Sequence, residues 1–183
     1  MKFAKARVEK LLITQPFGAV PVEVEKLEIM LAGIKYDRHF GLSRNSDVRT
    51  AKLLPKGLEV ANLRSVTIVS AEELAEISAD LGSEVLPDDM EANITLSGFE
   101  NLTKLSAGSF IKFPRNTILL VTAENLPCVI PGKNMMKRGI EKVKALNFAK
   151  HAMGKRGLTA MVFASGFVKV GDEVEIYQPQ SFE

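Results

Sequence analysis

Short runs of apolar residues, many of them alternating with polar ones, recur along the whole chain. Val20, Val22 and Val24 alternate with polar residues, and the same period of two is found around Val66 and Ile68. This period is typical of half-buried strands, because successive side chains point to opposite faces of a sheet. The candidate strands are residues 5–14, 20–24, 65–70, 92–97, 108–113, 116–123, 157–165 and 173–178. Glycine and proline separate them, which favours turns over crossover helices and predicts a mostly β barrel or sandwich.

Two stretches have helical periodicity instead. The first begins at Ser70-Ala-Glu-Glu73, a capping box in which the Ser70 side chain accepts an amide of the first turn and Glu73 reaches back to another. Its apolar residues Leu74, Ile77 and Leu81 share one face before Gly82 ends the helix.

The second predicted helix, roughly Met135–Met153, is less regular. Ile140, Val143 and Leu146 or Asn147 form one apolar stripe, while the lysines point elsewhere. We therefore expect the basic side of this helix to face solvent or a ligand.

Length and composition limit the class of protein. The 183 residues, 46% of them hydrophobic, contain no repeat or linker and fit one globular domain over residues 1–183. A single cysteine cannot form a disulfide within the chain, which favours a reducing compartment. No apolar run approaches the ~18 residues of a membrane span, and the first residues offer no signal-peptide core. We expect a cytoplasmic protein without a membrane partner.

The charges are distributed unevenly along the chain. Residues 70–100 contain nine acidic residues and no basic ones, whereas residues 131–157 contain eight basic residues against Glu141 alone. Residues 33–64 contain seven more basic residues against three acidic ones. If the two basic segments meet in space, they form a site for phosphate-like anions, because positive charge clustered in a cleft attracts them. The alternative is that each is a solvated face.

The surroundings of the single cysteine are suited to chemistry. Cys128 lies between Pro127 and Pro131, after an apolar strand candidate and before a basic stretch. Nearby positive charge favours the thiolate, which nucleophilic attack, persulfide carriage and soft-metal ligation all require. The alternative is a buried, inert thiol, but the flanking prolines indicate a loop rather than a core strand.

The two histidines, His39 and His151, have no spacing that indicates a pair with Cys128. One cysteine and two histidines also form no recognisable zinc pattern. We interpret each histidine as a polar anchor or phosphate contact rather than a catalytic group. The sequence contains no dinucleotide-binding glycine motif, P-loop, nucleophile elbow or zinc-protease motif.

Six short motifs follow one another along the chain. They are Gly33…Asp37-Arg38-His39-Phe40-Gly41, SVTIVSAEEL, Ala92-Asn93-Ile94…Gly98, Leu105…Gly108, VTAENLPC, and Lys155-Arg156-Gly157-Leu158…Gly166…Gly171-Asp172. In this order the chain resembles a stand-alone MOSC domain, the module named for the C-terminal part of molybdenum cofactor sulfurases. The resemblance covers about residues 20–177.

The resemblance implies a distorted, mostly antiparallel β-barrel with a few peripheral α-helices, whose mouth holds the molybdenum cofactor (molybdopterin). The cysteine at the position of Cys128 is implied to be the molybdenum ligand or to carry sulfur as a persulfide. A thiolate suits both roles, as a soft metal ligand and as the nucleophile of sulfur transfer.

The resemblance also implies which residues bind the cofactor. They are Asp37, Arg38, His39, Asn93 and Arg156; Arg49 is a further cofactor-binding candidate, chosen for its guanidinium group and not for a motif match. Residues 37–39 match the glycine-flanked motif that helps to line the pocket, and Asn93 matches the family's asparagine. Three arginines among them, Arg38, Arg49 and Arg156, are candidates for the cofactor's phosphate, because a guanidinium can bind phosphate oxygens in a bidentate manner.

The resemblance leaves two enzymatic activities open, sulfur transfer and reduction of N-hydroxylated small molecules. No pyridoxal phosphate site is expected, since 183 residues cannot hold that domain beside the barrel, so a cysteine desulfurase-type partner would supply sulfur. A reductase would need a separate electron-transfer protein, because the sequence has no flavin, haem or four-cysteine motif.

Two other classes of function remain as alternatives. One is a cofactor-free barrel that binds another anionic small molecule. The other is a nucleic-acid-binding barrel, which is disfavoured because residues 131–157 offer only Phe148 for base stacking. We therefore expect no nucleic-acid partner.

Overall fold

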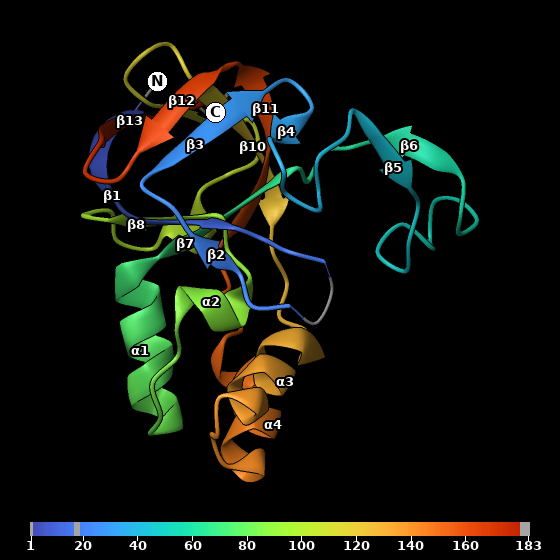
Figure 1. Ribbon diagram of the computed structural model, residues 1–183, viewed down its shortest axis with the longest axis vertical. Coiled ribbons are helices and arrows are strands. Elements are labelled where there is room, and N and C mark those ends of the chain that lie inside the picture. Colours follow the sequence, from blue (N-terminus) through green and yellow to red (C-terminus); the bar gives the residue numbers. More distant parts are fainter. Residues whose placement is uncertain (1, 17–18, 180–183) are drawn as a thin grey trace.

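A closed β-barrel forms the body of the protein (Figure 1). The computed structural model describes residues 2–16 and 19–179. Within them, seven strands close in the order β13-β9-β10-β11-β7-β8-β1, and β13 pairs back with β1. These strands are β1 (Lys2–Ile13), β7 (Val66–Ser70), β8 (Ile94–Ser97), β9 (Phe110–Lys112), β10 (Ile118–Glu124), β11 (Leu158–Ala164) and β13 (Glu173–Gln178). Neighbours are antiparallel except β7 and β8, which confirms the predicted mostly antiparallel barrel.

The barrel interior is apolar because alternate residues of each strand point inward. Leu11, Ile94, Ile111, Leu119 and Ile176 belong to this core and have no exposed surface. All five residues of β7 are buried, and helix α1 packs against both β7 and the neighbouring β8, whose first three residues are buried as well. The alternation along the chain therefore predicted both the strands and the side of each that packs inward.

The helix predicted after Ser70 is confirmed as α1 (Ala71–Leu81), with Leu74, Ile77 and Leu81 buried and Gly82 left-handed at its end. Ser70 Oγ accepts the Glu73 amide at 3.2 Å, as predicted. The other half of the capping box was predicted wrongly. Glu73 accepts hydrogen bonds from Thr103 instead of reaching back.

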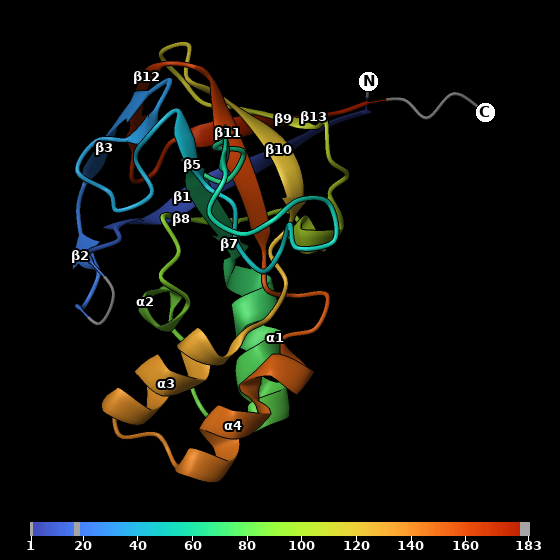
Figure 2. The same ribbon diagram turned by 90° about the vertical axis from the view of Figure 1, so that its right-hand side faces the viewer.

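The prediction of one helix over residues 135–153 was also wrong. Two helices are present, α3 (Val129–Lys137) and α4 (Lys142–His151), and they are separated at Gly139, whose φ of 91° is left-handed. The predicted stripe is shifted as well, since Leu146 is exposed while Ala145 and Phe148 are buried. Figure 2 shows α1, α3 and α4 gathered at one end of the barrel, where they share a second apolar core.

The remaining elements are short. They are β2 (Val22–Glu23), β3 (Lys26–Met30), β4 (Gly33–Ile34), β5 (Ser43–Asn45), β6 (Glu59–Ala61), α2 (Pro87–Met90), a 3₁₀ turn at Leu102–Lys104, and β12 (Gly166–Lys169). The alternation at residues 20–24 thus yields only β2, while β3, β4 and β12 form a small sheet. Strands β5 and β6 pair only with each other, and residues 43–61, here called the flap, project from the barrel (Figure 1). In the described part of the chain, no helix is long and apolar enough to span a membrane.

Candidate functional site

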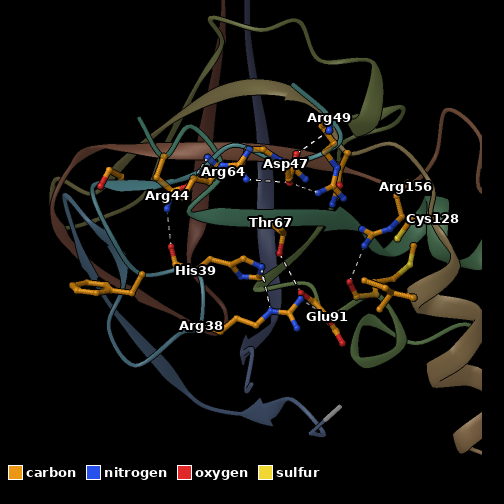
Figure 3. A pocket seen from close by; sticks show the side chains of 16 residues that line it. Arg38, His39, Arg44, Asp47, Arg49, Arg64, Thr67, Glu91, Cys128 and Arg156 are labelled. Atoms are coloured by element: carbon orange, nitrogen blue, oxygen red, sulfur yellow. Dashed lines mark hydrogen bonds and ion pairs between the residues drawn. The ribbon is translucent and has the colours of Figure 1, made fainter. Parts of the chain in front are cut away.

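An arginine-rich cavity of about 340 Å³ lies between the flap, the loop before α3 and the start of β11 (Figure 3). Its charged and nucleophilic lining residues are Arg38, His39, Arg44, Asp47, Arg49, Arg64, Glu91, Cys128 and Arg156. Five arginines therefore face two carboxylates. The two basic segments of the sequence meet here, because Arg156 belongs to one and the other four arginines belong to the other.

Most of the predicted site residues line this cavity. Arg38, His39, Arg49, Cys128 and Arg156 come together although they are far apart in the sequence. The structure adds two arginines that sequence analysis did not select, Arg44 and Arg64. Their only signal in the sequence is membership of the basic segment 33–64, which also contains lysines that do not line the cavity.

Asp37 and Asn93 do not lie on the cavity lining; they are buried beneath it. Asp37 Oδ2 accepts hydrogen bonds from Asn93 Nδ2 and the Thr14 amide, both at 2.7 Å. Burial opposes ionisation of Asp37, but hydrogen bonds from His39 and Thr14 outweigh it and lower the pKa of the carboxyl. The positions of these two residues therefore support anchoring of the 37–39 loop rather than direct contact with a ligand.

Both ring nitrogens of His39 are engaged. Nδ1 lies 2.9 Å from Asp37 Oδ1, and Nε2 lies 3.2 Å from Arg38 Nε, which can only donate. The contacts therefore assign a neutral ring that donates from Nδ1 and accepts at Nε2. Arg38 in turn donates to Glu91 Oε2 at 2.5 Å. This chain of contacts fixes Arg38 at the cavity wall and leaves His39 no ring nitrogen for a pair with Cys128, while His151 lies outside the lining.

Arg156 is the most buried cation of the cavity. Its Nη2 donates to the carbonyl of Met90 at 2.9 Å, but Nε and Nη1 are buried without a hydrogen-bond partner among the described residues. Burial lowers the pKa of Arg156 to about 10, although the negative charges of Glu91 and of the Cys128 thiolate act in the opposite direction. Buried donors without acceptors are unfavourable, so an anion in the cavity would stabilise this side chain.

A second group of arginines surrounds Asp47 on the flap. Asp47 Oδ2 lies 3.1 Å from Arg44, 3.4 Å from Arg49 and 3.9 Å from Arg64. One carboxylate is thus shared by three guanidinium groups. Burial, reinforced by Arg49 and Arg44, lowers the pKa of Arg64 to about 10. The group remains positive at neutral pH and attracts anions to the cavity mouth.

Cys128 lies at the junction between β10 and α3. It is a half-buried free thiol that directly precedes the first helical residue, Val129. The amides at a helix N-terminus favour negative charge, and the Arg156 side chain extends toward Cys128 (Figure 3). The thiol therefore faces positive charge from both the helix and the cavity.

The backbone beside Arg156 is tightly held. The Gly157 amide donates to Thr103 Oγ1 at 2.8 Å, and Thr103 Oγ1 donates to Glu73 Oε2 at 2.6 Å. The Gly157 carbonyl accepts the Asn125 amide at 2.8 Å. Glu73 and Thr103 therefore position the segment from which Arg156 enters the cavity.

Replacement of Glu73 by glutamine is expected to change how stability depends on pH. Burial raises the pKa of the Glu73 carboxyl above 4.5, although Thr103 acts in the opposite direction. Between pH 4.5 and the raised value, the folded protein binds more protons at Glu73 than the unfolded chain, so the free energy of unfolding falls as pH rises. Glu73→Gln removes this loss. In urea titrations from pH 4 to pH 8, the free energy of unfolding of the variant relative to that of native protein should increase as the pH rises.

Asp80→Asn on the same helix is the matched control, because the Asp80 carboxylate is solvent-exposed and forms a surface pair with Lys155. A stability difference between Glu73→Gln and native protein that stays constant with pH would contradict the assignment.

The cavity offers few metal ligands. Among the described residues, no cluster of three or more His, Cys, Asp or Glu side chains could hold a metal ion. A metal in this cavity would therefore need donor atoms from a bound organic ligand, with the Cys128 thiolate as an additional soft ligand.

Comparison with known proteins assigns the family. The MOSC domain model matches residues 36–175. Bacillus subtilis YuaD, whose provisional name describes metal–sulfur cluster biosynthesis, is 37% identical over 177 residues, which is 96% of this chain and 92% of YuaD. A crystal structure of that protein gives a TM-score of 0.92 at 36% identity and covers 98% of this chain and 99% of YuaD.

A more distant solved structure has the same fold. YiiM from Geobacillus stearothermophilus is 11% identical, with a TM-score of 0.64, and the match covers 96% of this chain and 75% of YiiM. At that identity the likeness concerns the fold alone. The family-model match and the relationship to YuaD confirm the resemblance seen in the motifs, and the chain belongs to the MOSC domain family.

Proposed function

We propose that the arginine-rich cavity binds the molybdenum cofactor and that Cys128 acts in it as the molybdenum ligand or as a sulfur carrier. The observation that supports this most directly is the buried Arg156 guanidinium, which has two donors without partners on the wall shared with Cys128. A buried cation and a free thiol in one cavity fit a ligand that combines anionic groups with a thiophilic atom.

The cavity and its residues fit the cofactor in four respects. The arginines Arg44, Arg49 and Arg64 offer planar donors to the phosphate, and Cys128 offers a soft thiolate to the metal. The cavity volume of about 340 Å³ lies at the lower end of small-molecule sites. The scarcity of protein metal ligands also agrees, because a pterin dithiolene supplies its own sulfur donors. When bound, the cofactor supplies a molybdenum centre and its redox chemistry.

The chain's own residues would bind and orient the cofactor. Arg38 is held at the wall by Glu91 and His39. Arg156 donates to the Met90 carbonyl, and the amide of the adjacent Gly157 donates to Thr103. These fixed cations compensate negative charge in the cavity without reorganising. Cys128 immediately precedes the first residue of α3, so its side chain lies at the helix end where the backbone amides carry partial positive charge.

The provisional name of YuaD favours a role in sulfur handling. In that role Cys128 holds a sulfane sulfur, for which a partner of the cysteine desulfurase type is one candidate donor. In a reductase role for N-hydroxylated compounds, a separate electron-transfer protein would be required instead.

The test is metal and pterin analysis of native protein and Cys128→Ser, both purified from a host that makes the cofactor. We expect molybdenum and pterin at about one per chain in native protein. In the variant we expect pterin to be retained and molybdenum to be lost or to change from sulfur to oxygen ligation. Arg7→Met, at an exposed position outside the cavity, is the matched control for Arg156→Met, which should lose the pterin as well.

Absence of pterin from the native protein would contradict cofactor binding. Two outcomes then differ: a persulfide on Cys128 would support sulfur carriage alone, and an unmodified thiol would support a barrel that binds another small anion.

A further inference from the structure

Arg156 differs from the other cavity arginines in the group that its guanidinium contacts. The guanidinium of Arg38 is paired with Glu91, and those of Arg44 and Arg49 are paired with Asp47. Among the described ion pairs, Arg156 has no carboxylate partner within 4.0 Å; its bond is to the Met90 carbonyl. It is 6% exposed, and Nε and Nη1 have no acceptor among the described residues. The side chain is therefore prepared for an anion with more than one oxygen atom.

The position of that anion is next to the thiol. Arg156 and Cys128 both line the cavity, and the view into it shows the guanidinium and the sulfur on the same wall (Figure 3). Helix α3 begins immediately after Cys128, and the partial positive charge of its N-terminus favours an anion at this point, although its third residue, Pro131, has no amide hydrogen to donate. A small tetrahedral dianion bound to Arg156 would thus lie within reach of the nucleophile.

We propose that Cys128 accepts sulfur directly from a small thiosulfonate-type dianion, of which thiosulfate is the simplest, bound through Arg156. The inference rests on the proposed sulfur-carrier role of Cys128 and names the class of donor. A donor of this class combines the two features that the cavity wall offers to bind, an oxyanion for the guanidinium and a sulfane sulfur for the thiolate.

The chemical step is balanced without an additional oxidant or reductant. The Cys128 thiolate attacks the sulfane sulfur of thiosulfate, and a new S–S bond forms at Sγ. The S–S bond of thiosulfate breaks, and its electron pair leaves with sulfite. Cys128 becomes a persulfide anion, which can pass the terminal sulfur to a thiophilic acceptor. Arg156 stabilises the negative charge that develops on the departing sulfite.

The experiment incubates the purified full-length protein with thiosulfate and measures the intact mass and the released sulfite. Native protein should gain one sulfur atom at Cys128 and release one sulfite per chain, and Cys128→Ser should do neither. Arg156→Met should slow the transfer at least about tenfold, since it removes a charge-assisted contact. Arg156→Lys should recover part of the rate by keeping the charge, and Arg7→Met should react like native protein.

Parallel incubation with inorganic polysulfide, which contains no oxygen, distinguishes the sulfur-carrier role of Cys128 from the proposed donor at Arg156. If polysulfide loads Cys128 and thiosulfate does not, the carrier role stands and the thiosulfonate donor is overturned. If neither reagent loads Cys128, the carrier role fails too, and molybdenum bound through Cys128 would support the ligand role. If Arg156→Met, with a native circular dichroism spectrum, reacts as fast as native protein, the donor site at Arg156 is overturned.

Discussion

Arg156→Met should raise the melting temperature of the ligand-free protein by about 2–4 °C and reduce its stabilisation by phosphate. The native guanidinium is buried with two unpartnered donors, and each such donor is unfavourable by about 1–3 kcal/mol. Methionine has a similar length and no donor. Loss of the Met90 contact offsets part of the gain, and a net change of about 1 kcal/mol corresponds to about 2–4 °C in a chain of this size.

The phosphate response follows from the same side chain. A ligand at about 100 times its Kd stabilises the folded state by about 2.7 kcal/mol, so native protein should melt at a higher temperature in phosphate than in chloride of equal ionic strength. The variant should show a smaller difference between the two salts than native protein, because only the arginines around Asp47 and Arg38 remain to bind phosphate. Thermal melts of native protein, Arg156→Met and Arg7→Met make the comparison, with Arg7→Met expected to respond like native protein.

The response should also depend on pH in a defined direction. Burial lowers the pKa values of Arg64 and Arg156 to about 10. Both side chains are therefore positive at pH 7–8 and lose charge as the pH rises through about 10, so the phosphate response of native protein should decline in that range. An Arg156→Met variant that is less stable than native protein and responds to phosphate as strongly as native protein would show that the guanidinium has a structural role only.

The barrel was predictable because its signals are local. Each barrel strand is marked by alternation or by an apolar run. Turn residues separate several of the strands, whereas α1 and α2 connect the parallel strands β7 and β8, and α3 and α4 connect β10 and β11. Where the prediction was wrong, tertiary contacts decide. Glu73 bonds to Thr103, thirty positions later, instead of closing its own capping box, and a left-handed Gly139 divides a stretch that the apolar periodicity predicted to be continuous. The flap has no core-facing pattern, since its strands pair only with each other.

The site was predictable to the extent that its residues stand out chemically. A solitary cysteine between prolines and two basic segments indicated a cavity with Cys128 and Arg156. Nothing in the sequence distinguishes Arg64 from the nearby lysines, because its role depends on the folding of the flap around Asp47. Asp37 and Asn93 occur in the family motifs, yet the structure places both below the lining, since a motif residue can position a loop as well as contact a ligand.

Gly157→Ala should cause the largest loss of stability, about 3–5 kcal/mol. Gly157 has a left-handed φ of 86°, and a Cβ at this position would lie 2.1 Å from the carbonyl oxygen of Ile68 on β7. A side chain there combines the backbone penalty of a left-handed residue with a clash against backbone that is part of the barrel. Urea denaturation of native and variant protein measures the loss.

Gly154→Ala separates the two effects. Gly154 is also left-handed, with a φ of 71°, but its Cβ would meet no atom within 4 Å. This control should therefore show only the backbone penalty, about 1–2 kcal/mol.

Because Gly157 directly follows Arg156, the backbone shift that relieves the clash should also move the guanidinium. The phosphate response should therefore weaken in Gly157→Ala, whereas Gly154→Ala should retain it. Equal losses of stability in the two variants would show that contact with β7 does not fix Arg156.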